Sequence, residues 1–84
     1  MEIKNLDHGI QEISTKNYCL LVNYTKVIGY YNYQNGIVYT CTRPHIAATT
    51  PNGQKHLDKW LDNLSYKGIR PTPYMEFNQL INNL

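Results

Sequence analysis

The stretch VIGYYNYQNGIVYTCT, residues 27–42, decides the predicted fold of this chain. Asn35-Gly36 stands in its middle and favours a two-residue hairpin turn, because such a turn needs positive φ at both central positions. The residues on either side are mainly valine, isoleucine, tyrosine and threonine, which are typical of strands. We therefore predict two antiparallel strands, residues 26–34 and 37–43.

The chain before this hairpin supplies a third strand and a helix. Residues 18–23 read as a strand that joins the hairpin through a tight turn at Tyr24-Thr25, which makes a three-stranded antiparallel meander. The helical spacing of the isoleucines and leucine at positions 3, 6, 10 and 13 predicts a short helix over residues 2–13. Gly9 lies inside this helix, where it costs about 1 kcal/mol relative to alanine.

Two further helices are expected after the meander. Leu57, Trp60, Leu61 and Leu64 form an apolar stripe at i, i+3, i+4 and i+7, and Thr50-Pro51 is a typical helix start. Thr72-Pro73 repeats that start signal before a final helix, and residues 65–71 read as a loop. The predicted fold class is α+β, a single domain over residues 1–84. It consists of a three-stranded antiparallel meander with an N-terminal helix and two C-terminal helices packed on one face.

Alternation along the predicted strands sorts the tyrosines onto two faces. Pairing through the two turns sets Tyr30 between Cys19 and Cys41. Tyr31 and Tyr33 then share the apolar face, which we take as the core. The opposite face mixes aromatic side chains with amides and cations, a composition typical of a protein interface. The predicted partner-binding residues are Tyr30, Asn32, Tyr39, Arg43 and Lys26. The alternative is that the N-terminal helix covers this face and its role is structural.

Composition and charge limit the classes of protein to which this chain can belong. The chain has 84 residues, 42% of them hydrophobic and 17% charged, and a net charge of +2, which is typical of one globular domain. Its longest apolar run has four residues, too few for a membrane span or a signal peptide, so we expect a cytoplasmic protein, of the cell or of a host cell. We expect Cys19 and Cys41 to be thiols, because a strand separates them by about 10 Å.

The basic residues are concentrated in the second half of the chain. Two aspartates oppose them, and solvated helix faces are the ordinary explanation for such a pattern. The possible nucleic-acid contacts are Arg43, Lys55, Lys59, Lys67 and Arg70.

Catalytic chemistry has little support. Cys41 and His45 lie close together in the sequence, but no residue that would orient the histidine is evident, so we interpret Cys41 as structural. Cys19, Cys41, His45 and His56 lack the spacing of a zinc site. We predict no catalytic residue, no metal site and no cofactor.

The sequence therefore favours a small non-catalytic protein that binds a larger host protein. Its size and its many asparagine, isoleucine, lysine and tyrosine residues are typical of inhibitors of host defence enzymes, anti-CRISPR proteins included, that phages and mobile elements carry. The first alternative is a nucleic-acid-binding protein that stacks bases on Tyr30 and Tyr39 beside Lys26 and Arg43. The second is a homodimer that sequesters a nucleotide ligand between its subunits.

Overall fold

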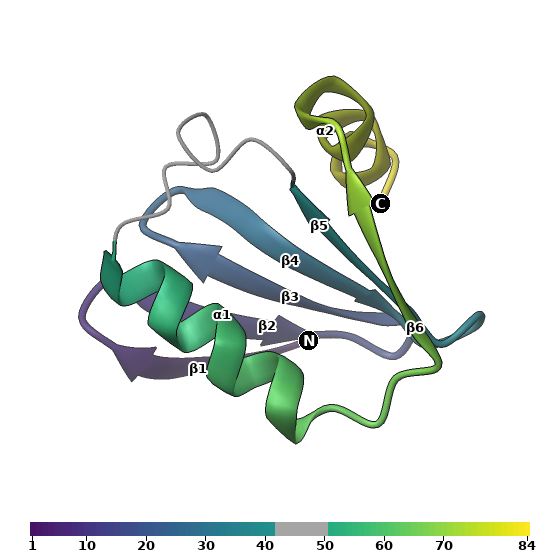
Figure 1. Cartoon of the computed structure of the whole chain (residues 1–84). Helices are drawn as coiled ribbons and strands as arrows, with labels where there is room; N and C mark the ends of the chain where they lie inside the picture. The colour runs from purple at the N-terminus through teal and green to yellow at the C-terminus, as the bar shows by residue number, and fades with distance from the viewer. Residues whose placement is uncertain (42–50) are drawn as a thin grey trace.

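The computed structural model describes residues 1–41 and 51–84, which form one mixed sheet of six strands and two helices (Figure 1). The elements are β1 (Glu2–Asp7), β2 (Ile10–Ser14), β3 (Tyr18–Asn23), β4 (Lys26–Asn32), β5 (Ile37–Cys41), α1 (Pro51–Asn63), β6 (Gly68–Thr72) and α2 (Tyr74–Asn82). The strands lie side by side in chain order, and every pair is antiparallel except β5 and β6. The connection between these two parallel strands contains α1, as a parallel pair requires.

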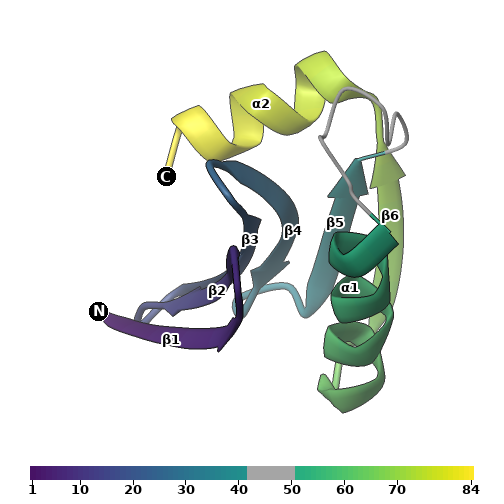
Figure 2. The same ribbon diagram turned by 90° about the vertical axis from the view of Figure 1, so that its left-hand side faces the viewer.

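This architecture shows that the predicted fold class was wrong. The predicted meander is present as β3, β4 and β5, but it is only half of the sheet. The helices do not share one face: α1 and α2 pack against opposite faces of a strongly curved sheet (Figure 2). Both C-terminal helices begin within a residue or two of their predicted start signals.

The first fourteen residues form the hairpin β1–β2 and not the predicted helix. Gly9 adopts φ +74° in the turn, a conformation that favours glycine. The backbone N–H of His8 donates to Asp7 Oδ1 at 2.7 Å, and the N–H of Tyr24 donates to the Gly9 carbonyl at 2.6 Å. A Cβ atom on Gly9 would lie 2.7 Å from the Tyr24 ring. His8 and Gly9 therefore form the turn, and this turn interrupts the apolar spacing that suggested a helix.

The segment predicted as a loop, residues 65–71, contains most of β6. The N–H of Lys67 donates to the Gly36 carbonyl at 2.8 Å, and Val38 and Ile69 are partners across the parallel pair. Pro71 lacks an N–H, so it suits the outermost strand of a sheet. The apolar residue Ile69 of β6 is exposed. The strand that β6 pairs with, β5, is far away in the sequence.

Two departures from ideal turns set the register of the central strands. The loop between β4 and β5 is longer than the predicted two-residue turn, because Asn32 pairs with Ile37. This sets Tyr30 opposite Tyr39 and not opposite Cys41. A bulge at Ile28 then shifts the β3–β4 register by one residue, so that Tyr30 faces Leu20 and not Cys19. The bulge transfers Tyr30 to the face of Leu20 and Val22.

The core under α1 is organised by Trp60, a member of the predicted apolar stripe, with 5% of this residue exposed. Its ring lies on Gly29 of β4, at the place a side chain of residue 29 would occupy, and its Nε1 donates to Glu12 Oε2 at 2.8 Å. The buried residues around it are Ile10, Cys19, Leu21, Ile28, Val38 and Leu57. One indole thus connects α1 to both β2 and β4.

The core under α2 contains Phe77, Leu20, Val22 and Tyr30. It includes a line of side chains that crosses all six strands on this face, each residue paired with the next across neighbouring strands. We call this line the transverse row, and its members are Ile3, Ile13, Leu20, Tyr30, Tyr39 and Arg70. The middle of the row is buried, whereas Ile3 and Arg70 at its two ends are exposed.

We expect Gly29→Ala to lower the free energy of unfolding by about 1–3 kcal/mol, because overpacking displaces a core side chain. The added Cβ would lie 2.5 Å from Trp60 Cζ3. Denaturant unfolding followed by circular dichroism measures the change. Gly68→Ala is the matched control, since its Cβ would meet only Ile37 Cδ1, at 3.4 Å. Equal stability of the two variants would contradict the role given to Trp60.

Candidate functional site

The structure does not bring the five predicted partner-binding residues together. Tyr30 is only 6% exposed, stacked on Tyr39 with ring centroids 5.4 Å apart and packed edge-on against Tyr18 at 6.1 Å. Burial, followed by the neighbouring Tyr39 hydroxyl, raises the pKa of Tyr30. Tyr30 is therefore a core residue, and α2, not an N-terminal helix, covers it. Arg43 lies outside the described residues.

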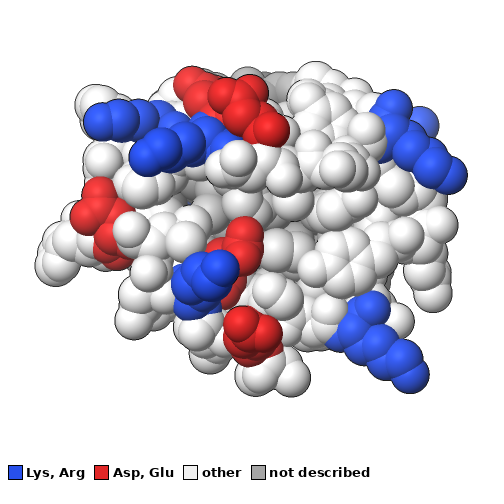
Figure 3. Space-filling view, turned by 90° about the horizontal axis from the view of Figure 1, so that it is seen from below, with Lys and Arg blue, Asp and Glu red and all other residues white. Residues whose placement is uncertain are grey.

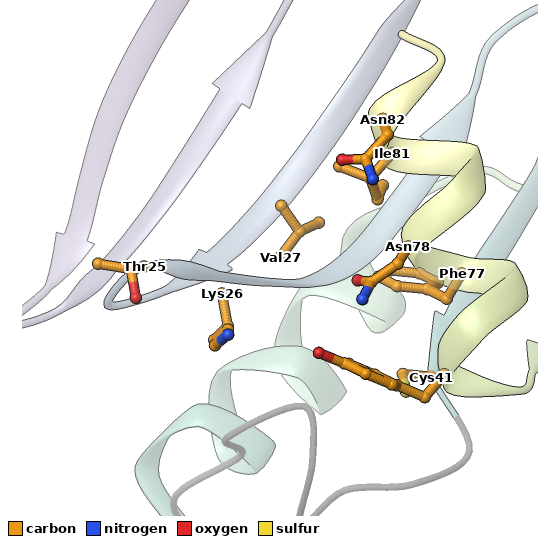
Figure 4. Close-up of a pocket in the computed structure, with 9 residues that line it drawn as sticks. Thr25, Lys26, Val27, Cys41, Phe77, Asn78, Ile81 and Asn82 are labelled. Carbon is orange, nitrogen blue, oxygen red and sulfur yellow. The ribbon is translucent and has the colours of Figure 1, made fainter.

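Lys26 lines a hollow beside α2, and Asn32 lines a separate hollow beside Tyr30. Figure 4 shows Lys26 and Val27 on one side of the first hollow, about 240 Å³ in volume, with Asn78 and Ile81 of α2 on the other. Asn32 borders the second, also about 240 Å³, but its Oδ1 accepts the N–H of Gln34 at 2.9 Å. Asn32 thus stabilises the β4–β5 loop.

Tyr39 remains accessible in a third hollow, which we call the β6–α2 groove. It has a volume of about 380 Å³, and its lining residues are Tyr39, Arg70, Pro71, Thr72, Glu76, Gln79, Leu80 and Asn83. Tyr39 is half-buried and held on two sides: its ring stacks on Tyr30, and its hydroxyl accepts a hydrogen bond from Asn35 Nδ2 at 3.0 Å. The groove therefore contains a fixed aromatic side chain.

Arg70 is the cation of this groove. It is the partner of Tyr39 in the β5–β6 register, so the two side chains are neighbours on one face. Arg70 is exposed and forms no ion pair with another described residue, although Glu76 lines the same groove. The groove can receive an apolar side chain next to a carboxylate. Its lining provides a tyrosine, an arginine, the apolar Leu80 and the amides of Gln79 and Asn83.

Sequence reasoning found Tyr39 but did not place Arg70 beside it. Arg70 was assigned to the basic segment, because residues 65–71 read as a loop and the pairing of β6 with β5 was not foreseen. The available signal was weak: Ile69 and Thr72 on either side of Arg70-Pro71 suit an edge strand that contains a proline.

Of the described basic residues that were candidates for nucleic-acid binding, Lys59 and Arg70 lie on different faces. Lys59 borders a hollow of about 330 Å³ beside α1, whereas Arg70 lies in the groove beside α2. The aliphatic part of Lys67 lies against Gly36. On the surface shown in Figure 3, some positive side chains lie beside negative ones and others stand alone, with uncharged surface between the groups. The described basic residues therefore do not make one continuous patch.

The described residues gather no metal-binding cluster. Within residues 1–41 and 51–84, no three histidine, cysteine or acidic side chains gather in a way that would hold a metal ion. His45, the proposed neighbour of Cys41, lies outside the described residues. Neither described helix is long and apolar enough to cross a membrane. Cys19 on β3 and Cys41 on β5 are both thiols, with β4 between them.

The two thiols should differ in reactivity. Burial, with the charge of Glu12 adding to it, raises the pKa of Cys19 to about 11, and Cys19 is only 4% exposed. Because the thiolate is the reactive form, we expect iodoacetamide at pH 8 to modify half-buried Cys41 well before Cys19. Peptide mass spectrometry over time measures the two rates. In denaturant the rates should become similar, and equal rates in the native protein would contradict the burial of Cys19.

A second titratable group joins the end of β1 to α1. The Asp7 carboxylate accepts hydrogen bonds from the His8 backbone N–H, His56 Nε2 at 3.0 Å and Asn52 Nδ2 at 3.4 Å. These bonds hold the pKa of Asp7 below its usual value of 3.8. Because the pKa of Asp7 is lower in the folded than in the unfolded protein, its carboxylate stabilises the fold at pH values above 3.8. This stabilisation is lost as the pH falls from 3.8 through the lowered pKa of the folded state.

We therefore expect Asp7→Asn, which keeps the shape and removes the charge, to lower the melting temperature at pH 7. The difference from the wild type should shrink as the pH falls through and below 3.8. Thermal unfolding at several pH values measures it. Asp62→Asn, a change at an exposed residue on α1, is the control and should have little effect. A pH-independent difference would mean that the Asp7 charge is not responsible.

Comparison of the chain with protein-family models, with curated proteins and with solved structures finds no match.

Proposed function

We propose that this chain is a non-catalytic binding protein that attaches to a larger protein through the β6–α2 groove. The observation that carries the proposal is the adjacency of Tyr39 and Arg70, partners on neighbouring strands that line the same groove. Tyrosine and arginine are the residue types, with tryptophan, that most often dominate protein interfaces.

The geometry of Tyr39 suits an anchor. Its ring is fixed by Tyr30 and its hydroxyl by Asn35, so binding would immobilise few additional rotatable bonds and lose little conformational entropy. Arg70 has no ion-pair partner in the described part of the chain, and its planar guanidinium can receive a carboxylate through two parallel hydrogen bonds. The partner would therefore present an aspartate or glutamate beside an apolar side chain.

The biological setting that we propose rests on composition alone. A short chain rich in asparagine, isoleucine, lysine and tyrosine is typical of inhibitors that phages and mobile elements direct at host defence enzymes. In such a role, the chain would act by occupying a surface of the enzyme. No chemical step by this chain is needed.

Nucleic acid is the weaker candidate partner because of where the cations lie. Lys59 and Arg70 border hollows on opposite faces of the sheet, so one strand of nucleic acid would not contact both along a straight path. Of the two tyrosines proposed to stack bases, Tyr30 is buried. These positions favour a protein partner.

We expect Tyr39→Ala and Arg70→Glu each to weaken partner binding by about 2 kcal/mol or more, the usual threshold for a dominant interface residue. The partner would first be captured from host lysate treated with nuclease, then purified and titrated by calorimetry against the wild type and the variants. The melting temperature of each variant separates a loss of binding from a loss of folding.

The matched controls lie away from the groove. Tyr33→Ala removes another exposed tyrosine, from the β4–β5 loop, and Lys59→Glu makes the same change of charge beside α1. Both should bind as the wild type does. The proposal fails if the controls lose affinity as much as the groove variants, or if nuclease treatment abolishes capture and the purified chain binds oligonucleotides instead.

A further inference from the structure

The β1 strand is the exposed edge of the sheet. All six of its residues, Glu2–Asp7, are exposed, and within the described residues β1 pairs only with β2. Its outer side therefore presents backbone N–H and C=O groups that can pair with another strand. The other edge is different, because Pro71 removes a donor from β6 and α2 lies beside it in the β6–α2 groove.

At this edge the transverse row ends on an exposed side chain. Leu20 and Tyr30 are buried in its middle, Ile13 is half-buried, and Ile3 at the β1 end is 57% exposed. An isoleucine so exposed at the end of a row whose middle is buried is the position where one more strand would bury apolar surface. A further strand beside β1 would place a new side chain directly opposite Ile3.

The sequence of β1 is complementary to itself in one register. When two copies of an edge pair antiparallel about a twofold axis perpendicular to the sheet, residues of the same parity face each other, so one residue faces its own copy. With Ile3 at the centre, Ile3 faces Ile3 of the second copy, and Glu2 faces Lys4 of the second copy. Symmetry repeats this opposite-charge pair, and the two isoleucines join the two transverse rows.

The neighbouring registers are worse on two counts. Centring the pair on Lys4 would set two lysines against each other, and centring it on Asn5 would leave Ile3 opposite Asp7. Both registers also extend into the irregularity at Leu6, where the β1–β2 pairing shifts between Asn5 and Asp7. The register centred on Ile3 uses only residues 1–5, which precede that irregularity.

We propose that the β1 edge is a self-association surface, and that its partner is a second copy of this chain paired antiparallel through residues 1–5. The proposal is independent of the β6–α2 groove, which lies at the other end of the sheet. The paired segment is short, so the dimer is weak and depends on concentration, as for the smaller class of interfaces.

Sedimentation velocity of the full chain, from about 10 µM to about 1 mM, tests the proposal in the range expected for weak association. The wild type should shift from monomer to dimer. Ile3→Lys should raise the dissociation constant at least about tenfold, because it sets two lysines face to face at the centre. Ile69→Lys, a change at the exposed isoleucine of the other edge, should leave the dissociation constant unchanged.

A charge exchange tests the register. Glu2→Lys alone and Lys4→Glu alone each set like charges opposite each other in both symmetry-related pairs, so each should be monomeric at concentrations where the wild type is a dimer. An equimolar mixture of the two variants restores opposite charges at both positions and should form a heterodimer. Lys4→Glu also faces Glu12 within its own chain, so the melting temperature of each variant is recorded before mixing.

Wild-type chain provides a test without substitutions. Backbone amides of β1 should exchange with solvent more slowly at high than at low protein concentration, whereas amides of β6 should not change. A wild type that stays monomeric throughout overturns the proposal. So does a dimer that Ile69→Lys disrupts and Ile3→Lys does not, or a mixture of the charge variants that remains monomeric.

Discussion

The contact of Trp60 with Gly29 determines where the second half of the chain goes. The indole lies where residue 29 has no side chain, and its N–H donates to Glu12 two strands away. This fixes α1 across β2, β3 and β4. A buried tryptophan typically accounts for about 3–5 kcal/mol, a large part of the stability of a small domain. Because α1 is the crossover to β6, the position of Arg70 beside Tyr39 depends on this one packing contact.

Local signals in the sequence were enough for half of the sheet and both helices. The three central strands and the turn at Tyr24-Thr25 follow from strand-forming residues between turn residues, and the starts of α1 and α2 from Pro51 and Pro73. The prediction for the first fourteen residues was wrong because apolar spacings of three and four fit a helix when the turn at His8 and Gly9 is discounted. The sequence did not predict β6 for a different reason. Its five residues include a proline, and only the packing of α1 brings them to β5.

The candidate site was predicted in part, and a single extra residue explains most of the error. Alternation assigned Tyr30 and Tyr39 to one face, and they do lie together, stacked at 5.4 Å. The bulge at Ile28 moved them to the face of Leu20, under α2, so Tyr30 is buried and only Tyr39 remains accessible. A bulge has no clear signature in one sequence, because its cost and benefit depend on both cores at once.

The abundance of tyrosine in the β4–β5 hairpin follows from a sheet with two cores. Tyr30 and Tyr39 stack on the α2 face, while Tyr31 packs edge-on against Tyr33 at 5.2 Å and donates its hydroxyl to the Ser65 carbonyl at 3.0 Å on the α1 face. A thin domain has little depth in which to bury large rings completely, and tyrosine tolerates this because its polar end can reach the surface. The same property lets Tyr39 belong to the core and to the β6–α2 groove.

The transverse row finally links the two ends of the sheet. It begins at exposed Ile3 on one edge and ends at Arg70 on the other, so the two proposed surfaces lie as far apart as one sheet allows. Pairing at β1 would therefore not cover the β6–α2 groove, and a dimer would carry one groove at each outer end of a continuous sheet. Because twist accumulates from strand to strand, the two grooves would face different directions. Binding of both at once would then favour a partner that is itself an assembly with repeated sites, and for such a partner a weak single groove gains avidity through effective concentration without any new contact.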